Sequence, residues 1–162
     1  MHYLTGTEEV EGIRWMQEAA HVATQALCLK SKCGVVIVQN GEIIGSGYNA
    51  PPLDDISHRV CLEEIAVGKP KYDRTCCMHA EWRAIFDALR RNPTKIVGSQ
   101  LFFVRVDEKG NIKKSGEPYC TVCSRMALDV GIATFHLWQE KGIAAYDTSE
   151  YNTLSYSYTE SK

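Results

Sequence analysis

Apolar residues recur every three or four positions near the start of the chain. These positions are Val10, Ile13, Met16, Ala20, Ala23 and Leu27. Such spacing is typical of an amphipathic helix that buries one face. Thr5 or Thr7 is placed to cap its first turn. The pattern therefore predicts a helix from Glu8 to about Leu29.

Two runs of apolar and β-branched residues follow, at 33–39 and 42–48, and Asn40 and Gly41 join them. A type I′ turn requires positive φ at both central residues, which Asn-Gly tolerates, so these runs predict a β-hairpin. Residues from about 49 to 77 lack a clear period and predict a long irregular connection. Long loops within a compact domain are often functional.

The second half of the chain alternates between helical and strand patterns. The predicted elements are a helix at 79–91, a strand at 100–106, a helix from Cys120 to about Val130 and a strand at 132–138. This order predicts one sheet with helices packed on it. The Tyr-, Ser- and Thr-rich residues 146–158 receive no assignment. A length of 162 residues favours a single domain over residues 1–162.

Composition excludes several classes of protein. The chain has 18 Lys and Arg against 20 Asp and Glu, which disfavours a nucleic-acid partner bound through a broad basic surface. No apolar run approaches the roughly 20 residues that span a bilayer. The first residues lack the basic start and apolar run of a signal peptide. We therefore expect a cytoplasmic protein with no membrane partner.

Seven cysteines in a reducing compartment are more often metal ligands or buried thiols than disulfides. Cys120 and Cys123 form a Cys-x-x-Cys pair at a predicted helix start, where unpaired N–H groups favour thiolates. His79 begins another helix and can supply a third ligand. Three protein ligands leave one open position on tetrahedral zinc, the arrangement of a catalytic site. Water at that position becomes acidic enough to supply hydroxide near neutral pH.

Glu81 lies on the apolar stripe of the helix at 79–91. The other members of this stripe are Ala84, Ile85 and Ala88. A carboxylate there is unfavourable unless it has a partner or a function, and beside a zinc-bound water it can act as general acid and base. On the opposite face, the spacing predicts the ion pairs Arg83–Asp87 and Asp87–Arg91.

His79-Ala80-Glu81, followed by Pro118-Tyr119-Cys120 and Cys123, resembles the signature of the zinc-dependent cytidine and deoxycytidylate deaminases. Gly47-Tyr48-Asn49-Ala50-Pro51-Pro52 is similar to a segment of the deoxycytidylate branch. The resemblance implies a three-layer α/β/α fold of the cytidine deaminase type, with a central mixed β-sheet of about five strands. It also implies a catalytic core at about residues 33–138.

The resemblance further implies a hydrolytic deaminase that converts an amino-substituted nucleobase to its keto form and releases ammonia. Zinc would be held by His79, Cys120 and Cys123, and Glu81 would transfer the protons. Its partner would be a small nucleotide or nucleoside.

Four further residues are implied to bind the substrate. Asn49 would contact the sugar hydroxyl, and the backbone N–H of Ala80 the ring carbonyl. The carbonyl of Glu117 or Pro118 would accept a hydrogen bond from the departing amine. This choice stays open because Tyr119 intervenes where the family usually places Pro directly before its first cysteine.

The substrate itself stays open. Among the candidate substrates, cytosine in the nucleotides dCMP or CMP ranks above the nucleosides cytidine and deoxycytidine. The same chemistry on tRNA adenosine, a guanine compound or a modified heterocycle is the alternative. A non-catalytic zinc-binding interaction domain is another alternative, but it does not explain why the carboxylate of Glu81 lies on the apolar stripe of its helix. Arg59, Lys71 and Arg74 are candidate phosphate contacts. Family members commonly form dimers or larger assemblies, so we expect a homo-oligomer.

The remaining cysteines divide into two groups. Cys28 and Cys33 are expected to be core or helix-end residues. Cys61, Cys76 and Cys77 border the long connection, where they form either a second metal site or ordinary thiols. His136 lies in an alternating strand, which favours a buried, hydrogen-bonded histidine over a metal ligand.

Overall fold

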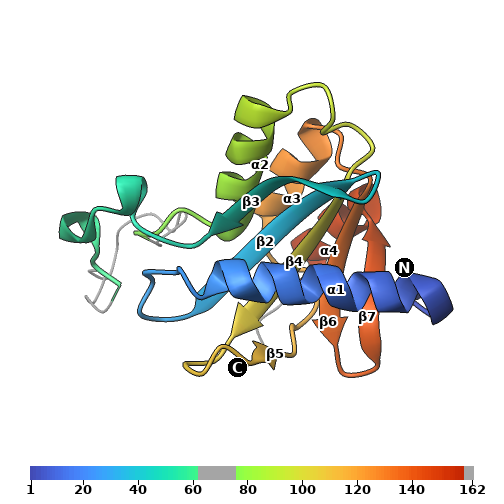
Figure 1. Ribbon diagram of the computed structural model, residues 1–162, viewed down its shortest axis with the longest axis horizontal. Helices are drawn as coiled ribbons and strands as arrows, with labels where there is room; N and C mark the ends of the chain where they lie inside the picture. Colours follow the sequence, from blue (N-terminus) through green and yellow to red (C-terminus); the bar gives the residue numbers. More distant parts are fainter. Residues whose placement is uncertain (62–75, 159–162) are drawn as a thin grey trace.

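The computed structural model describes residues 1–61 and 76–158, and one mixed β-sheet runs through the molecule (Figure 1). The sheet has seven strands in the order β1-β7-β6-β4-β2-β3, with β5 paired to β4. The strands are β1 His2–Tyr3, β2 Lys32–Gln39, β3 Glu42–Tyr48, β4 Gln100–Val106, β5 Ile112–Lys113, β6 Thr134–Gln139 and β7 Gly142–Asp147. The expectation of about five strands was too low, because two strands have only two residues and β7 lies in a part of the chain with no assignment.

Helices cover both faces of this sheet. They are α1 Gly6–Ala23, α2 Ala80–Arg91, α3 Thr121–Asp129 and α4 Thr148–Ser157. Helix α1 packs on one face with a core that includes Met16, Val36 and Phe102. Helices α2, α3 and α4 share the other face, with a core that includes Ile85 and Phe135. The predicted three-layer α/β/α arrangement is therefore confirmed (Figure 1).

The predicted hairpin is confirmed with its turn. Asn40 and Gly41 have φ values of 51° and 74°, as a type I′ turn requires. β2 pairs antiparallel with both β3 and β4. β4 and β6 are parallel, so the chain crosses between them through α3, as parallel pairing demands.

The end of one helix and the presence of one strand differ from the sequence-based expectations. Helix α1 ends at Ala23 rather than about Leu29, because the N–H of Leu27 donates to the carbonyl of Asn49 and the chain turns toward the end of the hairpin. The second difference is β7, which gives no alternating pattern because four successive residues, Ile143 to Tyr146, are buried. Strands covered on both faces read as continuous runs rather than alternating ones.

Glycines in β3 allow helix α2 to approach the sheet backbone closely. A Cβ atom at Gly47 would lie 2.3 Å from the carbonyl oxygen of Ala80 and 2.4 Å from the nitrogen of Ala84. One at Gly45 would lie 2.5 Å from the carbonyl oxygen of Ala84. Real Cβ atoms do not approach backbone this closely, so the position of the first turns of α2 depends on these two glycines.

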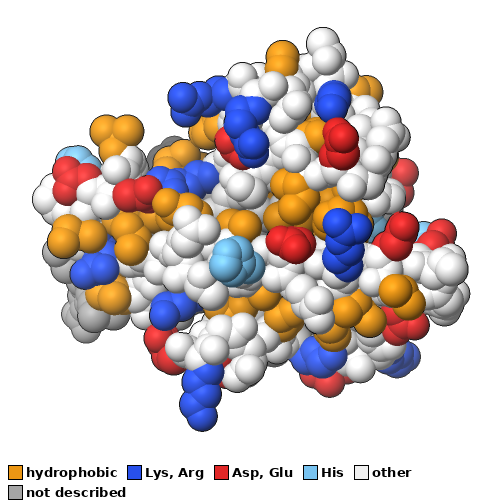
Figure 2. Space-filling model, viewed as in Figure 1, with side chains coloured by type: hydrophobic (Ala, Val, Ile, Leu, Met, Phe, Trp, Pro, Cys, Tyr) orange, Lys and Arg blue, Asp and Glu red, His pale blue; other side chains and the backbone are white. Residues whose placement is uncertain are grey.

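Charged side chains of both signs are interspersed over the face seen in Figure 2, as the near-balanced composition suggests. Among the helices of residues 1–61 and 76–158, none is both long and apolar enough to cross a membrane.

His136 is a buried, neutral histidine in the sheet. Its side chain is 3% exposed, and its ring stacks on Phe102 at 4.1 Å between centroids. Nδ1 lies 3.2 Å from the carbonyl oxygen of Leu101, and because a carbonyl can only accept, Nδ1 carries the proton. Burial lowers the pKa of His136 to about 4. The predicted buried strand histidine is confirmed.

Substitution of Gly47 by alanine should displace α2 from β3. We expect Gly47→Ala to lower the free energy of unfolding by about 2 kcal/mol or more, because the new methyl group overlaps backbone atoms that cannot move independently. Gly116→Ala is the matched control, since a Cβ there meets no atom within 4 Å. Urea unfolding of both variants measures the difference, and equal stability of the two would contradict the close approach.

His136 should make stability depend on pH. In the unfolded chain His136 is protonated below its ordinary pKa of about 6.5, whereas in the folded chain it stays neutral down to about pH 4. Stability is therefore lost as pH falls through this window, by about 3 kcal/mol at most. His136→Asn keeps a donor near Nδ1 but does not titrate. The free energy of unfolding of the wild type should fall more steeply than that of His136→Asn from pH 7 to 4. Parallel pH profiles of the two proteins would contradict this prediction.

Candidate zinc centre

Three potential metal ligands converge from the N-termini of two helices. His79 immediately precedes α2, Cys120 immediately precedes α3, and Cys123 lies in the first turn of α3. The Nδ1 atom of His79 is 3.1 Å from the Sγ atom of Cys123 and 3.6 Å from that of Cys120. The two sulfur atoms are 3.0 Å apart. The structure thus brings together the three ligands that the sequence predicted.

The donor set fits a zinc ion. Zinc–nitrogen distances of about 2.1 Å and zinc–sulfur distances of about 2.3 Å place tetrahedral donors roughly 3.5–3.8 Å apart. The three observed separations, 3.0 to 3.6 Å, reach these values with small outward shifts of the side chains. One imidazole and two thiols leave a fourth position for water or substrate.

The two cysteines differ in their acidity. The hydrogen bond between the two thiols, assisted by His79, lowers the pKa of the Cys120 thiol to about 4 against the opposing effect of burial. Burial and the neighbouring Cys120 raise the pKa of Cys123 well above its usual value. Cys120 is therefore ready to bind a cation as a thiolate, while Cys123 releases a proton when the metal binds.

Glu81 lies in the first turn of α2, next to these ligands, and its side chain belongs to the buried face of the helix. The residue is 5% exposed. Burial, followed by the charge of Cys120, raises the pKa of the Glu81 carboxyl, and the nearby His79 opposes this shift. A carboxyl with a raised pKa can both accept a proton and return it near neutral pH.

Two contacts hold the His79 ring and the segment that leads to it. The ring of Trp82 stacks on His79 with centroids 4.6 Å apart and planes at 11°. The N–H of Met78 donates to the carbonyl of Ala50 at 2.8 Å, which ties this segment to the chain just beyond β3. Sequence reasoning missed Trp82, although its position three residues after His79 on a helix predicts a contact.

Asn49 uses its side-chain amide to join the end of β3 to the start of β2. Its Oδ1 accepts from the N–H of Cys33 and its Nδ2 donates to the carbonyl of Ser31, both at 2.8 Å. An amide can make one further hydrogen bond at each end. The pKa of Cys33 is raised to about 11 by burial, with a smaller contribution from the charge of Glu81. Both ends of the Asn49 amide are thus anchored to the backbone before and at the start of β2.

The other residues implied to bind substrate adjoin the candidate ligands along the chain: Ala80 follows His79, and Glu117 and Pro118 come shortly before Cys120. Ala80 is buried and begins α2, where helix geometry gives the first N–H groups no partner within the helix. Pro118 is buried, whereas Glu117 is exposed. The Tyr119 hydroxyl accepts a hydrogen bond of 2.6 Å from the guanidinium of Arg105.

Three expectations about other side chains can now be compared with the structure. Arg91 pairs with Asp87, as predicted, but Arg83 pairs with Asp54 at 2.7 Å, because the turn after β3 reaches over α2. Arg59 donates to the carbonyl of Leu27 at 3.2 Å. The other two candidate phosphate contacts, Lys71 and Arg74, lie outside the described residues.

Cys28 was expected in the core or at a helix end, but it belongs to a cluster of thiols. Its Sγ lies 3.9 Å from that of Cys61. Cys33 is buried in the core as expected.

The comparisons with known proteins define the class. The family described as the cytidine and deoxycytidylate deaminase zinc-binding region matches residues 10–138. The chain therefore belongs to this family of zinc-dependent deaminases. No curated protein sequence matches it.

Solved structures show the same fold. The dCMP deaminase of the cyanophage S-TIM5, in complex with dCMP and dUMP, is 22% identical, with a TM-score of 0.54 and 82% of each chain covered. The cytidine deaminase of Burkholderia pseudomallei is 16% identical, with a TM-score of 0.56, and the match covers 86% of this chain and 94% of that one. The implied cytidine deaminase-type fold is confirmed.

Proposed function

We propose that this protein hydrolyses the exocyclic amino group of cytosine in a free nucleotide, dCMP or CMP, with zinc held by His79, Cys120 and Cys123. The observation that carries the proposal is the buried carboxyl of Glu81 beside these three ligands. A structural zinc site needs no such carboxyl, and its burial is unfavourable without a function.

The reaction consumes one water molecule and releases ammonia, so the ring carbon exchanges its bond to nitrogen for a bond to oxygen. Bound zinc supplies the Lewis acidity that makes water nucleophilic near neutral pH. Glu81 accepts a proton from the attacking water and delivers it to the ring nitrogen. It then takes the remaining proton of that water from the new hydroxyl group on the ring carbon and delivers it to the departing amine, so that the carbonyl forms as ammonia leaves. The raised pKa of its carboxyl suits this exchange in both directions.

Backbone and amide groups position the base and sugar. The N–H of Ala80 is directed along the axis of α2 and suits the ring carbonyl. The remaining hydrogen-bonding capacity of Asn49 suits a sugar hydroxyl. The buried position of Pro118 favours its carbonyl over that of exposed Glu117 as the acceptor for the departing amine.

Two observations support a free nucleotide as substrate. The cyanophage dCMP deaminase forms a complex with dCMP and dUMP, and Asn49 lies in the segment similar to deoxycytidylate deaminases. The near-zero net charge disfavours tRNA, because polynucleotide binding depends on many cationic contacts. We also propose a single cytoplasmic domain with its catalytic core at about residues 33–138, assembled as a homo-oligomer.

Removal of the Glu81 carboxylate should separate zinc binding from chemistry. We expect Glu81→Gln to retain zinc but to lower kcat for dCMP by at least about 100-fold, because it cannot transfer protons. Glu140→Gln is the control, since Glu140 is exposed. Ammonia release and metal analysis measure the two effects. A Glu81→Gln variant that stays fully active would contradict the mechanism.

A panel of amino-bearing substrates should identify the base and its phosphorylation state. We expect dCMP or CMP to give the highest kcat/KM, cytidine and deoxycytidine a lower value, and tRNA adenosine and guanine compounds no ammonia. The phosphate provides binding energy that a nucleoside lacks. A preference for cytidine or for tRNA would overturn the substrate assignment, and no reaction with any member would favour a non-catalytic zinc domain.

A further inference from the structure

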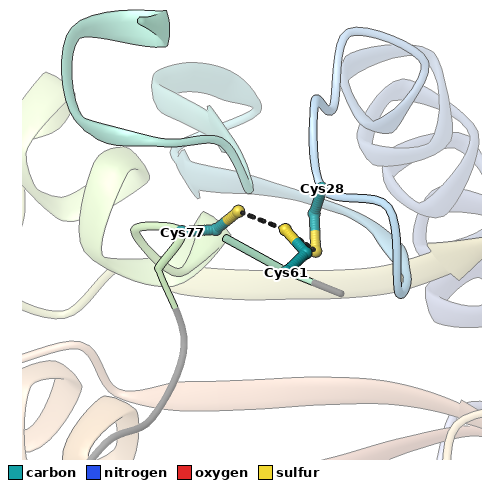
Figure 3. A group of neighbouring side chains, drawn as sticks. All are labelled: Cys28, Cys61 and Cys77. Carbon is teal, nitrogen blue, oxygen red and sulfur yellow. Dashed lines mark hydrogen bonds between the residues drawn. The ribbon is translucent and has the colours of Figure 1, made fainter. Parts of the chain in front are cut away.

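Four cysteines outside the candidate zinc centre gather at one point between three chain segments. Cys28 follows α1, Cys61 follows the 3-10 turn Ile56–His58, and Cys76 and Cys77 precede α2. Figure 3 shows the sulfur atoms of Cys28, Cys61 and Cys77 turned toward one another, with Cys61 in the middle. These three sulfur atoms all lie within 4.8 Å of one another.

The separations are those of a metal site rather than of disulfides. The Sγ atom of Cys61 is 3.3 Å from Cys76, 3.6 Å from Cys77 and 3.9 Å from Cys28, and the two adjacent cysteines are 3.8 Å apart. A disulfide requires about 2.05 Å between sulfur atoms. Four thiolates around tetrahedral zinc lie about 3.8 Å apart, given a zinc–sulfur distance of about 2.3 Å.

The surroundings can stabilise the negative charge of such a site. The backbone N–H of Val60 points at the Sγ atom of Cys76, at 3.3 Å. The guanidinium of Arg59 is bound to the carbonyl of Leu27, next to Cys28 in the chain. Four thiolates with one divalent cation carry a net charge of −2, so a nearby N–H donor and a cation both reduce the cost of burial.

We propose that Cys28, Cys61, Cys76 and Cys77 bind a second zinc ion, separate from the catalytic one. Binding displaces the thiol protons to solvent and joins three segments that are distant in sequence. A site with four protein ligands has no open position, so its role is structural. The bound zinc holds the segment that leads through Met78 into His79. This inference does not depend on the proposed substrate or activity.

Metal analysis of the full-length protein tests the proposal. We expect two zinc ions per chain in the wild type and one in Cys61→Ala. The double variant Cys120→Ala/Cys123→Ala should also keep one. Cys33→Ala is the matched control, because Cys33 is a buried cysteine outside both clusters, and it should keep two. One zinc in the wild type, or a second zinc that survives Cys61→Ala, would overturn the proposal.

Cobalt substitution then counts the thiolates at each site. The thiolate-to-cobalt absorbance per bound ion should be about twofold stronger in Cys120→Ala/Cys123→Ala than in Cys61→Ala, because four rather than two thiolates remain. This measurement decides the matter even if Cys61→Ala fails to fold, since the double variant leaves the four-cysteine cluster intact. A double variant that binds no cobalt, or whose remaining cysteines are found as disulfides under non-reducing conditions, would refute the second site.

Discussion

The close approach of α2 to β3 is the constraint on which the rest of the site depends. Without side chains at Gly45 and Gly47, the backbone of the helix lies against the backbone of the strand. This contact fixes the first turn of α2, and with it the positions of His79 and Glu81. Because β3 pairs with β2, whose six central residues are buried, the helix start is held against the core of the sheet. The Glu81 carboxyl, the proposed general acid and base, is therefore positioned by the helix and the sheet rather than by a loop.

The two ligand-bearing helices contribute electrostatics as well as position. Both α2 and α3 begin at the metal ligands, so their positive ends point at the two thiols. This field favours the thiolate of Cys120, whose pKa is lowered to about 4, whereas burial keeps Cys123 protonated until a metal binds and disfavours the charged form of Glu81. One arrangement therefore presents a thiolate at Cys120 beside a carboxyl that is easily protonated. This separation of acidities is what acid–base chemistry beside a metal requires.

The sequence predicted the parts of this arrangement that depend on local pattern. The Asn40–Gly41 turn, the strand at 100–106 and the ligands at two helix starts follow from short-range chemistry, and the structure has them where expected. β7 could not be found, because burial on both faces removes its alternation. Nor could the place of Cys28 be predicted, since its neighbours Cys61 and Cys77 are more than thirty residues away and meet it only through the tertiary fold.

The segment from Cys76 to His79 links the two thiol clusters and gives the second one a consequence for the first. Met78 is held by its bridge to Ala50, and Cys77 lies only two residues from His79, the proposed ligand of the catalytic zinc, roughly 7 Å along an extended chain. Helix α2 fixes His79 from one side, but nothing in a helix fixes the chain before its first residue. The proposed second zinc ion, bound by Cys76 and Cys77, would supply that restraint from the other side. The imidazole, stacked on Trp82, then has little freedom to leave the position at which zinc needs it.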